Sequence, residues 1–102
     1  MNRVKFVDHD PNYVYFECPG CKRHHVLPVG EGCKNKWNFN NNLERPTLHP
    51  SILATWDYGP NRIKNICHSY VTDGKIQFLG DCTHELSGKT IDLPDVENDD
   101  KY

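Results

Sequence analysis

The chain has 102 residues, a length that fits a single domain. Its apolar fraction is only 36%, so any hydrophobic core is thin and a bound metal would help to hold it. The net charge of −2 argues against a protein that binds nucleic acid through an overall positive charge.

The charge is unevenly distributed along the chain. Residues 1–90 carry eleven Lys/Arg and nine Asp/Glu, whereas residues 91–102 carry five acidic residues and one lysine. Acidic chain ends of this kind are usually solvated and frayed. We therefore expect one domain over residues 1–95 and an acidic C-terminal tail over residues 96–102.

The sequence shows no membrane or secretion signal. No apolar run approaches the ~18–20 residues that a membrane span needs, and residues 1–8 lack the apolar stretch of a signal peptide. These patterns predict a cytoplasmic protein with no membrane partner. Thiols stay reduced in the cytoplasm, so the cysteines are expected to bind metal rather than to form disulfides.

The predicted elements are all strands. Aromatic and β-branched residues, or alternation of apolar with polar residues, mark seven segments between turn signals. They are 3–7, 13–17, 25–29, 36–40, 51–56, 66–71 and 75–80. No stretch of useful length has a helical period. The pattern predicts a small, mainly β domain with antiparallel sheets.

The segment Cys18-Pro19-Gly20-Cys21 joins the second and third of these strands. Pro19 fixes its own φ angle, and Gly20 can adopt the positive φ that such turns often need. A hairpin of this kind aims two sulfur atoms at one point. Cys-x-x-C in a reduced chain is a typical half of a structural zinc site.

A second hairpin is predicted around Asp73-Gly74, a strong turn dipeptide between segments 66–71 and 75–80. A two-residue turn places Thr72 opposite Lys75. Opposed residues share a face of the sheet, and that face repeats every two residues.

This register divides the chemically active residues of the hairpin between two faces. Cys67 lies on the apolar face together with Cys82 and, if the strand continues, His84. Cys67 and Cys82 are then one diagonal step apart, close enough to share a metal. The other face carries His68 and Asp81.

We therefore predict one structural Zn²⁺ that links the two hairpins. The predicted ligands are Cys18, Cys21, Cys67 and Cys82, with His25 and His84 as alternates. Cys33 has no partner at ligand spacing and is read as a spare thiol.

Two other activities are consistent with these residues. His68, Asp81 and His84 could serve a zinc-dependent hydrolase, although His/Asp pairs on sheets are common as plain contacts between strands. Lys22 and Arg23 on the first hairpin could contact phosphates in a nucleic-acid-binding zinc ribbon. The sequence lacks a recognised catalytic or RNA-binding signature, which favours an interaction protein over an enzyme.

The ordered motifs resemble those of a family of small phage and prophage proteins of unknown function. The matching blocks are 18–25, 37–39, 46–52, 67–74, 76–84, 88–90 and 93–94, within a stretch of about residues 14–95. Members are often labelled "ammonia monooxygenase", but that enzyme is embedded in a membrane and this chain has no span.

The resemblance implies a phage origin, a zinc-binding β fold and a pattern that includes Pro46-Thr47 and Pro50-Ser51. From it we expect an interaction protein that acts on a host or phage macromolecule, including host defence systems. A host or phage protein is the expected partner, and nucleic acid is the alternative. The oligomeric state stays open.

Overall fold

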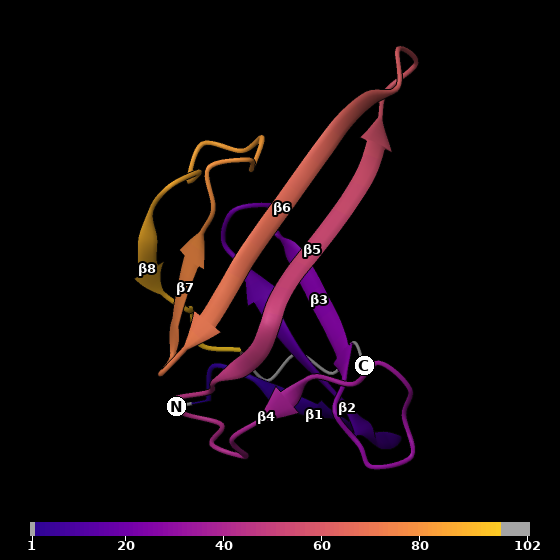
Figure 1. Ribbon diagram of the computed structural model, residues 1–102, viewed down its shortest axis with the longest axis vertical. Coiled ribbons are helices and arrows are strands. Elements are labelled where there is room, and N and C mark those ends of the chain that lie inside the picture. Colours follow the sequence, from indigo (N-terminus) through magenta and orange to yellow (C-terminus); the bar gives the residue numbers. More distant parts are fainter. Residues whose placement is uncertain (1, 97–102) are drawn as a thin grey trace.

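The computed structural model describes residues 2–96, which form two antiparallel sheets and no helix (Figure 1). The three-stranded sheet has the order β1 (Lys5–Val7), β2 (Asp10–Cys18), β3 (Arg23–Pro28). The five-stranded sheet has the order β4 (Asn38–Phe39), β5 (Leu48–Tyr58), β6 (Ile63–Thr72), β7 (Lys75–Phe78), β8 (Thr90–Asp92). The predicted mainly β, antiparallel fold is confirmed.

Alternating burial along β6 explains how the larger sheet is oriented. Cys67, Ser69 and Val71 are buried, whereas the residues between them are half-buried or exposed. Side chains of a strand alternate between its two faces, so one face of this sheet packs inward and the other meets solvent.

The main core lies between the two sheets. It joins apolar side chains of β2 and β3 to those of β5, β6 and β7. Its members include Val14, Phe16, Cys18, Leu27, Leu48, Ile52, Cys67, Val71, Ile76 and Phe78. The two predicted cysteine-bearing hairpins are therefore packed against each other.

All seven predicted strand segments contain or overlap an observed strand, with shifted ends. Strand β8 was not predicted, because Thr90–Asp92 is short and half exposed and lies beside Pro94. Of the predicted acidic tail, Val96 packs in a small cluster with Val7 and Tyr15. The rest of that tail, residues 97–102, lies outside the described residues.

The Asp73-Gly74 hairpin has the predicted register. Thr72 lies opposite Lys75, and the pairing continues to Ser69 and Phe78. Asp73 (φ 50°) and Gly74 (φ 79°) both have positive φ, as a two-residue turn of this type requires. Beyond Phe78 the strand ends, so the alternation that was extrapolated to residue 82 does not hold.

Strand β5 carries a bulge that matters for the site. Leu48 pairs with Val71 and Ile52 with Ser69, so the three residues 49–51 face only one residue of β6. Bulges bend a strand and re-aim side chains, and they are frequent beside active sites. The bulge includes Pro50, which follows a cis peptide bond, and Ser51.

The β5–β6 hairpin is the longest feature of the fold and projects from the body of the molecule (Figure 1). Strand β4 pairs with β5 only at Leu48 and His49. Within residues 2–96, no helix is long and apolar enough to cross a membrane.

The turn at Gly74 offers a test of the fold. A Cβ at Gly74 would lie 3.4 Å from backbone atoms of Glu44 and Arg45, and its φ is 79°. Gly74→Ala should therefore lower the free energy of unfolding by about 1–2 kcal/mol, the usual penalty for left-handed backbone. Urea denaturation measures this. Gly32→Ala is the matched control, because a Cβ there meets nothing within 4 Å. Equal stability of both variants would contradict the turn geometry.

Candidate functional site

Two side chains of the larger sheet and one from a neighbouring loop form a hydrogen-bonded row. His68 Nε2 lies 3.2 Å from Ser51 Oγ, and His68 Nδ1 lies 3.0 Å from Asp81 Oδ2. Ser51 comes from β5, His68 from β6, and Asp81 from the loop after β7. The row has the connectivity nucleophile–base–carboxylate that defines a catalytic triad by geometry.

Asp81 sets the direction of the hydrogen bonds in this row. An ionised carboxylate can only accept, so His68 Nδ1 carries the proton that is donated to Asp81. In the neutral imidazole the other ring nitrogen, Nε2, is then an acceptor, and the Ser51 hydroxyl donates to it. The imidazole therefore holds the tautomer that can remove a proton from Ser51.

The loop that carries Asp81 is fixed to the backbone of His68. The Leu79 amide donates to the His68 carbonyl at 2.9 Å. The thiol of Cys82 contacts both the His68 amide and the His68 carbonyl at 3.2 Å. These contacts hold Asp81 beside the His68 ring, although strand pairing has already ended.

The row is shallow. The side chain of His68 is 25% exposed and that of Asp81 is 52% exposed. Ser51 is half-buried. Among residues 2–96, the row is therefore partly accessible from the solvent-facing side of the sheet.

The opposite face of β6 contributes to a second cluster. Cys18, Cys21, His25 and Cys67 each place a ligand atom within 4.8 Å of the others, so the four could hold a metal ion. Cys18 Sγ lies 3.6 Å from Cys67 Sγ, and His25 Nε2 lies 3.2 Å from Cys21 Sγ and 3.9 Å from Cys67 Sγ. All five cysteines are free.

These separations fit tetrahedral coordination. Metal–sulfur bonds of about 2.3 Å and a metal–nitrogen bond of about 2.0 Å place the ligand atoms of a tetrahedral zinc site about 3.5–3.8 Å apart. Cys₃His is a usual ligand set for such sites. The residues present therefore fit a four-coordinate metal.

The electrostatics of the cluster also favour a cation. Hydrogen bonds from Cys21 and Cys67 lower the pKa of Cys18, while the neighbouring Cys18 and Cys21 sulfurs raise the pKa of Cys67. Burial alone would lower the pKa of His25, but hydrogen bonds and charge from Cys18 and Cys21 outweigh burial and raise it to about 9. Thiolates this close repel one another, and a metal cation removes that repulsion.

The cluster differs from the predicted ligand set at one place. His25, an alternate in the sequence prediction, lies where Cys82 was expected. The chain turns after Phe78, with the Cys82 amide donating to the Leu79 carbonyl, and this carries the Cys82 sulfur to the His68 backbone.

His84 belongs to neither group of side chains. Its ring packs edge-on against Phe78 at 4.5 Å, and its Nδ1 accepts from the Leu86 amide. A Cβ on Gly20 would overlap the His84 ring, so glycine permits this close approach. The positive φ expected at Gly20 occurs instead at Lys22, whose φ is 58°.

The other predicted candidates have structural contacts. The Arg23 guanidinium stacks on the Trp56 ring at 4.6 Å, a cation–π contact. Cys33 is half-buried, apart from the four-residue cluster, with its sulfur 3.9 Å from the Asn12 carbonyl.

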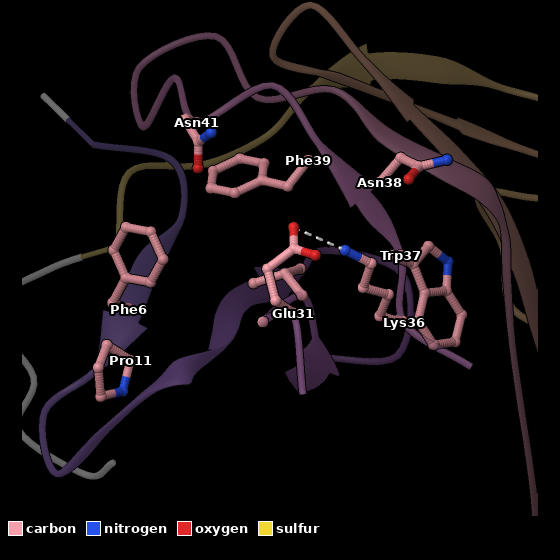
Figure 2. A pocket seen from close by; sticks show the side chains of 10 residues that line it. Phe6, Pro11, Glu31, Lys36, Trp37, Asn38, Phe39 and Asn41 are labelled. Atoms are coloured by element: carbon pink, nitrogen blue, oxygen red, sulfur yellow. Dashed lines mark hydrogen bonds and ion pairs between the residues drawn. The ribbon is translucent and has the colours of Figure 1, made fainter. Parts of the chain in front are cut away.

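A hollow of about 370 Å³ lies beside the start of β4 (Figure 2). Phe6, Trp37 and Phe39 line it, and Lys36 pairs there with Glu31 at 3.1 Å. The Trp37 indole N–H also donates to the Pro50 carbonyl at 3.0 Å. One residue that lines the hollow is therefore hydrogen-bonded to the residue before Ser51.

Sequence reasoning brought His68 and Asp81 to one face but missed Ser51. No glycine-flanked nucleophile motif surrounds Ser51. The available signal was Pro50-Ser51, two residues of the block 46–52 that carries the family resemblance. Its position opposite His68 follows from the β5 bulge, which the sequence pattern did not indicate.

Metal content tests the composition of the cluster. Cys18→Ser, His25→Ala and Cys67→Ser should each lower the bound metal per chain, because each removes one of four ligands. Cys82→Ser and the control Cys33→Ser should retain it. Elemental analysis of purified protein measures the content. Full occupancy in the His25 variant, together with loss in the Cys82 variant, would contradict this cluster.

A comparison with known families completes the description of the site. The model of one family matches residues 2–79, and its description is "bacterial ubiquitination-like system serine protease (BubE)". No curated protein and no solved structure matches the chain. The match includes Ser51, His68 and all four cluster residues, and Asp81 follows two residues later. Over most of its length, therefore, this chain belongs to the BubE family.

Proposed function

We propose that this chain is a serine protease of a bacterial ubiquitination-like system, with Ser51 as nucleophile, His68 as general base and Asp81 as the group that orients His68. The row of hydrogen bonds through both nitrogens of His68 carries the proposal. The family description supports the reaction class and the setting.

The proposed reaction follows from the direction of those hydrogen bonds. His68 Nε2 accepts the Ser51 proton while Ser51 Oγ attacks the carbonyl carbon of a peptide bond. His68 then gives that proton to the leaving amine, the C–N bond breaks and an acyl ester remains on Ser51. A water molecule, deprotonated by His68, cleaves the ester and restores Ser51. Asp81 stabilises the imidazolium that forms in each half.

We infer that the metal is zinc and that its role is structural. Three sulfurs and one imidazole complete a four-coordinate site and leave no position for a water, which a catalytic zinc needs. Cys67 and His68 are adjacent in β6, so the metal holds the strand that presents the base. This differs from a zinc hydrolase built on His68, Asp81 and His84, because the row faces away from the cluster and lacks His84.

The wider setting rests on sequence reasoning. A cytoplasmic location, a phage origin and action on a host or phage protein remain proposals for this chain. Nucleic-acid binding by Lys22 and Arg23 is the weaker alternative, because the Arg23 guanidinium already stacks on Trp56.

Substitution of the three residues tests the proposed mechanism. Ser51→Ala and His68→Ala should lower kcat for hydrolysis of p-nitrophenyl acetate by about 10⁶-fold, and Asp81→Asn should lower it by about 10³–10⁴-fold. Ser87→Ala is the matched control, because the Ser87 hydroxyl donates to the Leu79 carbonyl and not to Ser51, His68 or Asp81. A fluorophosphonate should form an adduct on Ser51, located by mass spectrometry.

Other outcomes of these experiments would contradict the proposed mechanism. Hydrolysis that survives Ser51→Ala at the wild-type rate would assign the activity to another group. A fluorophosphonate adduct on Ser69 or Ser87 instead of Ser51 would contradict the assignment of the nucleophile. Circular dichroism of each variant separates lost chemistry from lost folding.

A further inference from the structure

One edge of β5 is open beside Ser51. Strand β6 pairs with β5 along its length, but on the other edge β4 reaches only Leu48 and His49. The Pro50 carbonyl accepts a hydrogen bond from the Trp37 indole N–H. Among the strands of residues 2–96, none pairs with this edge from Ser51 onward.

The pairing pattern shows which backbone groups point to this edge. The His68 amide and carbonyl point toward the loop after β7, so those of Cys67 and Ser69 point toward β5. Their partners Ala54 and Ile52 point back toward β6. Leu53 and Thr55 alternate with Ile52 and Ala54 along β5. Each of them therefore presents its N–H and its C=O to the open edge.

The side chains along this stretch are unusual for a solvent-facing strand. Leu53 lies directly opposite His68 in the register and is 59% exposed. Tyr70, two residues from His68 on the same face of β6, is 39% exposed. Two large apolar side chains thus flank the base on the face that also carries Ser51. Apolar side chains beside an unpaired edge are typical of a place where another strand binds.

We propose that the substrate of this site is a polypeptide segment that binds in extended form as an added strand on the β5 edge from Ser51 to Asp57. Backbone groups of Leu53 and Thr55 hydrogen-bond the segment, and the carbonyl to be cleaved lies at Ser51 Oγ. The Leu53 side chain contacts an apolar residue of the segment. The inference deepens the proposed function and rests on it.

Strand addition fits two properties of the site. Backbone hydrogen bonds supply affinity that depends little on sequence, and a side-chain contact supplies selectivity. Asp81 and Leu53 are both more than half exposed, so an added segment would shield a row that the chain leaves open to water. A small ester has no peptide backbone and needs none of these contacts. The proposal is testable because changes at the β5 edge should affect peptide cleavage and leave ester chemistry at Ser51 unaffected.

Proline substitutions separate strand binding from triad chemistry. Leu53→Pro and Thr55→Pro each remove one outward N–H, and proline is tolerated where an edge N–H faces solvent. Leu53→Val and Thr55→Val are the matched controls, because they keep the N–H. The probe is a mixture of peptides from a digested bacterial proteome, with cleavage sites and rates read by mass spectrometry. Fluorophosphonate labelling of Ser51 in the same samples reports whether the triad is still reactive.

We expect each proline variant to cleave the mixture about ten-fold more slowly, the effect of one lost hydrogen bond of ordinary strength. Labelling of Ser51 should stay within about two-fold of wild type, as a small probe needs no strand. Leu53→Asp should also abolish a preference for an apolar residue at one position of the cleaved peptides.

Three results would overturn the inference. The first is proline variants that cleave at the wild-type rate, and the second is a wild-type chain that is labelled at Ser51 yet cleaves no peptide of the mixture. The third is a wild-type dimer in light scattering that Leu53→Pro converts to monomer, because a second copy would then occupy the edge. Absence of Ser51 labelling in the wild type would instead contradict the proposed function itself.

Discussion

The structure depends on one strand that serves two sites through its two faces. Side chains of β6 alternate, so Cys67 faces inward to the cysteine–histidine cluster and His68 faces outward to Ser51 and Asp81. A change of one residue in the register of β6 would exchange these roles and destroy both sites. The buried apolar side chain of Val71 and the turn at Asp73-Gly74 oppose such a change.

The small size of the chain explains why the two sites are coupled. A domain of this size with few apolar residues gains little stability from its core, and a metal held by the cluster would supply part of the rest by joining the two hairpins. Cys18 and Cys67 come from different sheets, so the cluster fixes how the sheets pack. Contacts of Leu79, Cys82 and Thr83 with the backbone of β6 then hold the loop of Asp81. Residues 2–96 leave the proposed triad partly exposed, and we assign its cover to the bound substrate.

Local patterns predicted much of the fold and part of the site. The Asp-Gly turn set the hairpin register, which placed Cys67 and His68 on opposite faces, because period-two alternation acts over a few residues. The position of Cys82 could not be extrapolated, since a turn after Phe78 ends the alternation. The position of Ser51 beside His68 depends on the bulge in β5, which leaves no local signal in the sequence. The sequence could identify His25 only as an alternate metal ligand, because spacing alone does not choose between histidine and cysteine.

The central claim is that the metal cluster on one face of β6 holds the catalytic row on the other. The most direct measurement is the rate at which a fluorophosphonate labels Ser51 before metal removal, after removal by a chelator, and after zinc is returned. We predict that labelling falls on removal and recovers with zinc, because Cys67 and His68 share one strand. An unchanged rate in protein shown by elemental analysis to be free of metal would contradict the claim.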